Sequence, residues 1–339
     1  MMQKTLHSFK AKTIDEAEIP YPVADNDVIL VDTILCGICR SDIGSYARWE
    51  NMPLTSEDNP TGLGHFGHEG LGRVVHVGEN IKGVSVGDIV STWSDPAYAY
   101  TYRATQEEFA VVPEIDPKYI LQPTACAINI IRKTERMMQY MDIFDEDILL
   151  LGTGFMSIII GQYLKSMGTA HKLTVAGSHN REHWSGITEL VSLDNIRKSG
   201  KRYKAVIDLT SKASNYDIIS NELADLEALI CYAATPYSPV TTNFFNNCWD
   251  CHTFIMPSPR NIDFPNIMRD TARYIESGVI DPSTLWTHSY NRSDIHDVRR
   301  GFEEGMNRNE TYVRGYIIIG NKVNQYEYNL YNGLRANQY

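Results

Sequence analysis

The stretch Leu149–Ser157 reads LLLGTGFMS, an apolar run that passes directly into a glycine-rich turn. Residues 158–167 then follow the apolar spacing of a helix, and a second apolar run spans Lys172–Ala176. A strand, a glycine turn, a helix and a second strand make up a βαβ unit. The stretch therefore predicts a parallel, doubly wound sheet that carries a dinucleotide-binding turn.

The segment before this unit has a different character. Up to Pro123 the sequence consists of short β-rich runs separated by turn residues, as in Val28–Thr33, Gly72–Val77 and Phe109–Val112. After Pro123 helix and strand patterns alternate, and the β-rich character returns with Arg314–Ile319. We therefore expect an α/β protein of two domains. Residues 1–122 and 263–339 form a β-rich domain, and residues 123–262 form the dinucleotide-binding domain.

Composition narrows the class of protein. The chain has 339 residues, 43% hydrophobic and 22% charged, which suits two buried cores. The formal net charge of −11, without a basic run, disfavours nucleic acid or an anionic membrane as a partner. The amino terminus lacks a secretory pattern, and the longest apolar runs are too short to span a bilayer. Six cysteines do not form a disulfide framework, so we expect a cytoplasmic protein with free thiols.

Two short segments carry residues that bind metals. Residues 36–42 read CGICRSD, and residues 67–74 read GHEGLGRV. Together they offer a thiolate, an imidazole and a carboxylate, a set that suits Zn²⁺. A catalytic zinc needs three protein ligands and a fourth position for water or substrate. A single Cys or His more often packs in a core or lies on the surface, so the prediction depends on both segments together.

These two segments resemble the catalytic-zinc signatures of the zinc-containing medium-chain dehydrogenase/reductase family. The resemblance extends from about Asp27 to Gly320. It implies a GroES-like catalytic domain, a Rossmann domain and the activity of an NAD(P)-dependent alcohol dehydrogenase. It also implies that Cys39 and His68 bind the zinc, with Glu69 as a neighbouring or alternating ligand.

The resemblance assigns roles to the neighbours of these residues. Asp42 is expected to orient His68, as carboxylates behind a metal ligand commonly do. Ser41 matches the hydroxyl that passes the substrate proton on, and Arg40 matches a position that reaches the cofactor pyrophosphate. Many members carry a His three residues after that hydroxyl, where this chain has Gly44. The outer end of the proton path therefore stays open.

The third protein ligand in this family usually lies just before the nucleotide domain. Here that stretch reads LQPTAC, which places Gln122 at the expected position and Cys126 four positions further on. A neutral amide oxygen is a poorer zinc ligand than a carboxylate, and we place Gln122 first. The segment Ser91–Gln106 contains no cysteine, so we predict one catalytic zinc and no structural zinc.

A second metal hypothesis joins the pairs Cys36/Cys39 and Cys248/Cys251 as a four-thiolate site. The two pairs lie far apart in the sequence, and the first lies inside the better-matched motif. Packing near a domain or subunit contact is the alternative role of Cys248 and Cys251, with Trp249 between them, and of His252. The tail beyond Gly320 is expected to pack against the body or a second subunit.

The cofactor turn has the pattern G-x-G-x-x-S, in which a small final residue still permits close packing of helix on strand. The second strand ends in a segment with no acid before Glu182. Small polar residues followed by a cation suit a 2′-phosphate, so we expect NADP(H) in preference to NAD(H). The expected cofactor contacts are Arg40, Gly152, Thr153, Gly154, Phe155, Met156, Gly177, Ser178, His179 and Arg181.

The resemblance favours a sugar, polyol or cyclitol as the small-molecule substrate and a homodimer or homotetramer as the assembly. Four residues are candidates for hydrogen bonding and stacking on a sugar, or for plain packing: Tyr46, Trp49, Trp93 and Asp95. A simple secondary alcohol is an alternative substrate. A zinc-free reductase of the quinone-reductase type and a non-catalytic nucleotide-binding relative are alternative classes of protein.

Overall fold

The computed structural model describes residues 2–7, 12–48, 67–234, 240, 249–258, 261–309 and 311–320. Contacts divide the chain into two compact units. Unit 1 comprises residues 1–123, 268–272 and 283–339, and unit 2 comprises residues 124–267 and 273–282. The second unit thus extends past residue 262, where we placed its end. One reason is that Asp281 donates its backbone N–H to Gln162 Oε1 at 2.9 Å.

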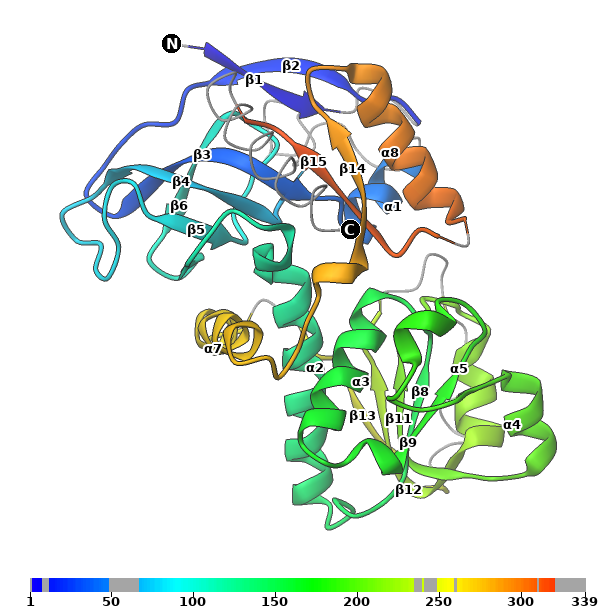
Figure 1. Cartoon of the computed structure of the whole chain (residues 1–339). Helices are drawn as coiled ribbons and strands as arrows, with labels where there is room; N and C mark the ends of the chain where they lie inside the picture. Colours follow the sequence, from blue (N-terminus) through cyan, green and yellow to red (C-terminus); the bar gives the residue numbers. More distant parts are fainter. Residues whose placement is uncertain are drawn as a thin grey trace. The chain divides into compact units, whose positions relative to one another are not determined.

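Unit 1 is built on a mixed seven-stranded sheet with the order β14-β15-β3-β4-β5-β7, in which β6 also pairs with β3 (Figure 1). Strands β1 and β2 form a separate antiparallel pair. The strands of unit 1 are β1 (Met2–His7), β2 (Asp15–Pro20), β3 (Val28–Gly37), β4 (Gly70–Val77), β5 (Ile89–Thr92), β6 (Thr101–Thr105), β7 (Phe109–Val112), β14 (Trp286–Asn291) and β15 (Arg314–Ile318). Its helices are α1 (Arg40–Arg48) and α8 (Ile295–Asn307).

Strand β3 forms the centre of unit 1. Nine of its ten residues are buried, because it pairs with β4, β6 and β15 and is covered on both faces. Tyr46 of α1 packs against Phe302 of α8, with ring centroids 5.3 Å apart. Aliphatic side chains of the sheet complete this core, among them Val31, Val74 and Ile317.

Unit 2 is the doubly wound parallel sheet that the sequence predicts. Six parallel strands have the order β10-β9-β8-β11-β12-β13, and the helices lie around them (Figure 1). The strands are β8 (Ile148–Leu151), β9 (Leu173–Ala176), β10 (Leu190–Val191), β11 (Tyr203–Asp208), β12 (Ala224–Tyr232) and β13 (Thr253–Ile255). The helices are α3 (Phe155–Ser166), α4 (Leu193–Ser199) and α5 (Asn215–Ile218).

The strand order reverses at β8, which has β9 on one side and β11 on the other. In such sheets ligands bind at the carboxyl end of the strands where the order reverses. The glycine turn after Leu151 occupies that position. Both the fold class and the placement of the turn are therefore as the sequence predicts.

Two longer helices complete the description: α2 (Leu121–Tyr140) and α7 (Phe264–Glu276). Helix α2 begins at Leu121, so Gln122 lies in its first turn. Among the described helices none has both the length and the apolar composition that crossing a bilayer requires.

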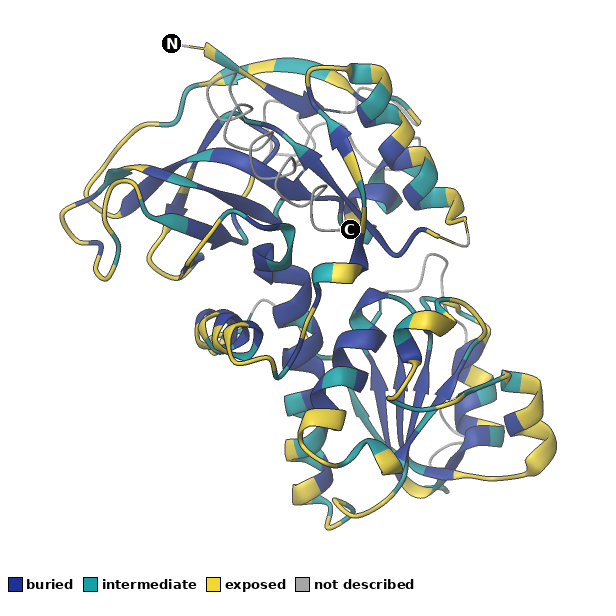
Figure 2. Ribbon diagram, viewed as in Figure 1, coloured by how far each residue is buried: buried dark blue, intermediate teal, exposed yellow. Residues whose placement is uncertain are grey.

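Helix α3 of unit 2 packs tightly through Gly161. The central strands of both sheets are buried, and the helices expose one side (Figure 2). A Cβ atom on Gly161 would lie 2.7 Å from Cζ3 of Trp184, a side chain that is itself 1% exposed. The glycine therefore permits the close approach of Trp184 to the helix.

We predict that Gly161→Ala destabilises the protein by about 1–3 kcal/mol, because the extra methyl group overpacks the contact with Trp184. At a helix position with space for a methyl group, the change from Gly to Ala stabilises the protein by about 0.5–1 kcal/mol. The sign of the change in unfolding free energy therefore shows whether Gly161 is tightly packed. Denaturant unfolding monitored by circular dichroism measures the difference. Adding Trp184→Phe should recover part of the loss, whereas a stabilised Gly161→Ala variant would refute the packing argument.

Candidate metal centre and cofactor turn

The two metal-binding segments meet because β3 and β4 are paired. The antiparallel register places Cys36 opposite Gly70, and Gly37 donates its backbone N–H to Glu69 O at 2.9 Å. Cys39 lies just after the end of β3, and His68 and Glu69 lie just before the start of β4. The hydrogen-bonded strand ends therefore bring the sequence-predicted thiolate, imidazole and carboxylate to one place.

The side chains of these three residues converge. One ligand atom each from Cys39, His68 and Glu69 lies within 4.8 Å of the others. In the described part of the chain this is the one group of three or more such residues that could hold a metal ion. Oε2 of Glu69 is buried and has no hydrogen-bond partner there. A buried carboxylate oxygen without a donor, beside a thiol and an imidazole, fits a zinc ion.

The charge distribution around the imidazole also favours a cation. Burial lowers the pKa of His68, but the Cys39 thiolate and the Asp42 carboxylate outweigh it, and the pKa lies well above the ordinary value. In a metal-free site a proton on the ring thus offsets the anionic groups. A metal ion replaces that proton when it binds, because its ligands must be deprotonated.

Asp42 stands behind His68, as the resemblance implies. Its side chain is buried, and Oδ1 lies 3.7 Å from Nδ1 of His68. Burial raises the pKa of Asp42 to about 6, and the charge of His68 opposes that rise. The carboxylate is thus placed to fix the orientation of the ring.

Tyr98 is a residue that sequence reasoning missed. Its buried hydroxyl lies 3.1 Å from Gly37 O and 3.4 Å from Oδ2 of Asp42, and it can donate its proton to either. Gly67 has a φ of +81°, and a Cβ there would lie 2.6 Å from the Tyr98 ring. Tyr98 therefore packs under the metal-binding loop and supports Asp42. No local sequence pattern identifies Tyr98 as a functional residue. It lies in the segment Ser91–Gln106, which the sequence distinguishes only by the absence of cysteine.

Arg314 is the second missed residue, since the sequence showed it only as the start of a strand. From β15 its Nη2 pairs with Oε1 of Glu69, which is fully buried. Burial lowers the pKa of Arg314, but the charges of Glu69 and Cys39 outweigh it and raise the pKa above the ordinary value. A Cβ on Gly37 would overlap Oε2 of Glu69, so only glycine leaves space for this carboxylate.

Ser41 and Arg40 follow Cys39 on α1. Ser41 is exposed, and its hydroxyl donates to Sγ of Cys39 at 3.1 Å. Arg40 is half-buried and donates from Nη1 to Gly305 O of α8 at 3.0 Å. Ser41 is thus beside the proposed metal ligand, whereas the contact of Arg40 with a cofactor stays a prediction.

Gln122 is buried in the first turn of α2, one helical turn before the half-buried Cys126. Its role as a metal ligand stays a prediction. Cys36 is fully buried, and burial raises the pKa of its thiol well above the ordinary value. A thiol in that state is an inert core residue, which weakens the four-thiolate hypothesis. Cys248 lies outside the described residues, and Cys251 is exposed.

The residues that the sequence offered as contacts to a sugar differ in their surroundings. Tyr46 is 1% exposed and donates its hydroxyl to Lys12 O, so it belongs to the core. Trp93 donates its indole N–H to Glu107 O at 3.0 Å. Trp49 lies outside the described residues. His252 has a buried ring that meets Phe254 edge-on, in agreement with a packing role.

The glycine turn of unit 2 has the geometry that its sequence predicts. Gly152 has a φ of +114°, a conformation that favours glycine, and it donates its N–H to Ala176 O. Helix α3 begins at Phe155, directly after Gly154, so its N-terminal N–H groups are available to an anion. Phe155 is buried, and Met156 is half-buried.

The end of β9 packs against this turn. A Cβ on Gly177 would lie 2.4 Å from Cγ2 of Thr153, and Asn180 donates from Nδ2 to Thr153 O at 2.9 Å. Ser178, His179 and Arg181 are exposed. The turn and the polar segment that follows β9 therefore form one continuous surface, as dinucleotide binding requires.

Comparisons with known proteins agree with this fold. Residues 25–115 match the alcohol dehydrogenase GroES-like domain. An uncharacterized zinc-type alcohol dehydrogenase-like protein of Escherichia coli, YdjJ, is 22% identical over 90% of this chain and 95% of its own length. Staphylococcus aureus TarJ in complex with NADPH superposes with a TM-score of 0.76 and 16% identity, covering 94% of this chain and 99% of TarJ. Escherichia coli rspB, complexed with NADH, gives a TM-score of 0.74, 17% identity and coverage of 94% and 99%.

The structure therefore has two units, with a candidate metal centre in the β-rich unit and a candidate dinucleotide turn in the other. Residues 25–115 match the GroES-like domain of alcohol dehydrogenases, and the chain as a whole has the fold of a GroES-like unit joined to a Rossmann-type unit. Over most of its length the chain is similar to a zinc-type alcohol dehydrogenase-like protein.

We predict that Arg314→Leu destabilises the metal-free protein by about 3–5 kcal/mol, because it leaves the buried Glu69 carboxylate unpaired. The matched control is Arg103→Leu, which removes an ion pair with Asp25 in which both side chains are more than 40% exposed. That change should cost less than about 1 kcal/mol. Denaturant unfolding in the presence of a chelator measures both values. Equal losses in the two variants would contradict the role of Arg314.

Proposed function

We propose that this protein is a zinc-dependent oxidoreductase that transfers a hydride between NADP(H) and a hydroxyl or carbonyl substrate, a sugar, polyol or cyclitol. The observation that carries the proposal is the convergence of Cys39, His68 and Glu69, whose ligand atoms lie within 4.8 Å of one another. Such a set, with a position left for substrate, is what a catalytic zinc needs.

Cys39 and His68 would hold the ion, with Glu69 as a neighbouring or alternating ligand and Gln122 as the fourth candidate. The ion would supply Lewis acidity, which polarises the substrate oxygen. Asp42 holds His68 in orientation, and Tyr98 holds Asp42. The Ser41 hydroxyl, next to Cys39 Sγ, would relay the substrate proton: it takes up the proton that the substrate hydroxyl gives up while its own proton passes on towards solvent. Arg314 balances the charge of Glu69 when that carboxylate does not bind the ion.

The dinucleotide would bind at the turn Gly152–Gly154, with its pyrophosphate at the start of α3. Solved structures of this fold hold NADH in one case and NADPH in another, so the fold leaves the choice open. The preference for NADP(H) rests on Ser178 and Arg181, exposed after β9 with no acid before Glu182. A guanidinium there can pair with a 2′-phosphate in two-point geometry.

We propose a single zinc per chain, because Ser91–Gln106 has no cysteine to build a structural site. We also propose a homodimer or homotetramer. Support comes from β13, which is the last of the described strands on its side of the sheet. Trp249 and Met256, which are 88% and 68% exposed, flank it in the sequence. A sheet edge with apolar side chains beside it is a surface that proteins usually cover.

The other classes of protein remain distinguishable. A zinc-free reductase usually lacks the Cys and His-Glu pair that this chain has, and metal analysis separates the two. A non-catalytic relative would fail to turn over any substrate, even with metal and dinucleotide bound. A simple secondary-alcohol dehydrogenase would reduce NADP⁺ with small alcohols but not with sugars, polyols or cyclitols.

The direct test is NADP⁺ reduction with a panel of sugars, polyols, cyclitols and small alcohols. We predict that Cys39→Ala and His68→Ala each abolish turnover, while NADPH fluorescence still reports dinucleotide binding. Cys251→Ala, at an exposed cysteine outside the site, is the control and should keep full activity. Active Cys39→Ala and His68→Ala variants would show that the metal assignment is wrong.

We predict that Arg181→Ala raises KM for NADP⁺ by roughly tenfold and leaves KM for NAD⁺ nearly unchanged, because it removes a charge-assisted pair with the 2′-phosphate. Lys198→Ala, an exposed cation on α4 of the same unit, serves as the control. Steady-state kinetics with both dinucleotides measure the split. Equal effects on the two dinucleotides would remove Arg181 from the account of specificity.

A further inference from the structure

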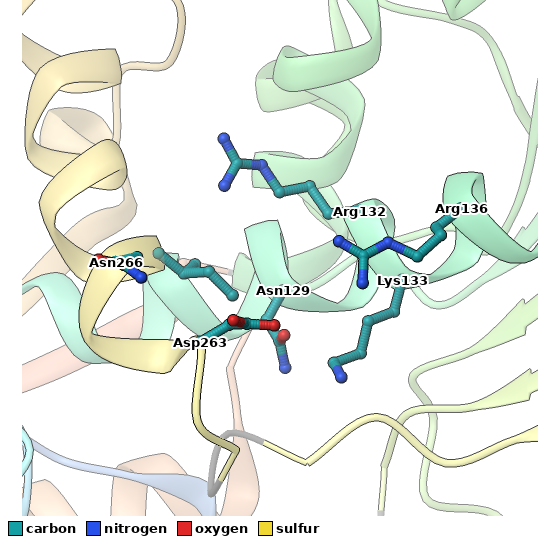
Figure 3. Close-up of a pocket in the computed structure, with 7 residues that line it drawn as sticks. Asn129, Arg132, Lys133, Arg136, Asp263 and Asn266 are labelled. Carbon is teal, nitrogen blue, oxygen red and sulfur yellow. The ribbon is translucent and has the colours of Figure 1, made fainter.

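A cavity in unit 2 is lined by none of the residues that we propose for hydride transfer. It has a volume of about 200 Å³ and lies between α2 and the start of α7. Arg132, Lys133 and Arg136 line it from α2, while Asp263 and Asn266 line it from the opposite wall (Figure 3). Three cations around one cavity stand out in a chain whose formal net charge is −11.

Topology separates this cavity from the dinucleotide turn. Helix α2 ends at Tyr140 and leads into the amino end of β8, whereas the glycine turn follows the carboxyl end of that strand. The cationic residues 132–136 thus belong to the half of α2 that approaches the opposite end of β8. The dinucleotide does not account for them.

The three cations differ in their partners. Arg132 donates from Nη2 to the Tyr274 hydroxyl at 2.6 Å, and its guanidinium lies 5.4 Å from the centre of that ring. Among the ion pairs of the described residues, none includes Lys133 or Arg136. These two cations, three positions apart on one helix, repel each other, and no described residue forms an ion pair with either of them.

The wall beside these cations is fixed by hydrogen bonds. Asn129, 1% exposed, donates from Nδ2 to Ser258 O at 3.0 Å. Asn261 donates from Nδ2 to the same carbonyl at 2.7 Å and lies 3.4 Å from Asn129 Oδ1. The segment after β13 is therefore tied to α2, so a ligand here would meet a preformed wall and a lower ordering cost.

A second cavity, of about 450 Å³, shares Lys133 and Arg136 with the first. Its other lining is mainly apolar and includes Met137 of α2 and Met256 after β13. The two cations therefore stand at the border between a polar cavity and an apolar one. A ligand that satisfies both needs an anionic head and an apolar group.

We propose that this double cavity is a binding site for an amphipathic organic phosphate. The phosphate head lies between Lys133 and Arg136, and the apolar group packs on Met137 and Met256. Two charge-assisted contacts hold the head, and burial of apolar surface adds to them. Asp263 is the one carboxylate in the lining of the first cavity, and it weakens the binding of the anion by repulsion.

The test is a calorimetric titration of the full chain with octyl phosphate in the presence of saturating NADPH. Inorganic phosphate and octanol, which carry only one half of the ligand each, should bind at least about tenfold more weakly. The variant Lys133→Gln/Arg136→Gln should lose about tenfold in affinity for octyl phosphate. Lys198→Gln, a cation elsewhere in the unit, should leave it unchanged. Rising salt should weaken binding to the native protein but hardly affect the double variant.

Asp263→Asn should increase the affinity for octyl phosphate by roughly two- to fivefold, whereas the double variant decreases it, because the change removes the repulsion between the carboxylate and the anion. A second assay measures whether the protein pellets with vesicles that contain phosphatidic acid. If the native protein pellets and the double variant does not, the ligand is a lipid headgroup at a membrane surface. Octyl phosphate binding without such pelleting would assign the ligand to solution, and both results support the site. Absence of saturable binding, displacement by NADPH, or equal affinity of the native protein and the double variant would overturn the proposal.

Discussion

The pairing of β3 with β4 brings the candidate metal ligands of the β-rich unit together. Gly37 donates its N–H to Glu69 O at 2.9 Å, in a register that sets Cys36 opposite Gly70. That pairing places the residues after one strand beside the residues before the other. A slip of one position would turn every side chain to the other face of the sheet, so the metal-binding set exists only in this register.

The candidate metal centre contains two buried carboxylates, and neighbouring side chains stabilise the charge of each. Glu69 and Asp42 are carboxylates with almost no exposure, and a buried charge without a partner is costly. Arg314 pairs with the first, while His68 and the Tyr98 hydroxyl lie beside the second. A bound cation would take over part of this role. The β-rich unit thus carries the candidate metal ligands, and the parallel sheet carries the candidate dinucleotide turn.

Local sequence patterns predicted those parts of the structure whose functional residues lie close together in the sequence. The turn at Gly152–Gly154 and the two metal-binding segments are each encoded within a few residues, so the fold class and the candidate ligands could be predicted. Arg314 could not, because it is 245 positions from the carboxylate that it pairs with. Tyr98 was missed because the carboxylate that it contacts, Asp42, is also distant in the sequence. Tyr46 is a core residue, because its burial depends on tertiary packing against Phe302.

The central claim is that one thiolate and one imidazole bind a single zinc ion in the β-rich unit. X-ray absorption at the zinc edge, combined with metal analysis of the purified protein, tests it most directly. The account predicts one zinc per chain, with one sulfur at about 2.3 Å and lighter nitrogen or oxygen ligands at about 2.0–2.2 Å. A shell of four sulfurs, or a catalytically active protein without zinc, would contradict it.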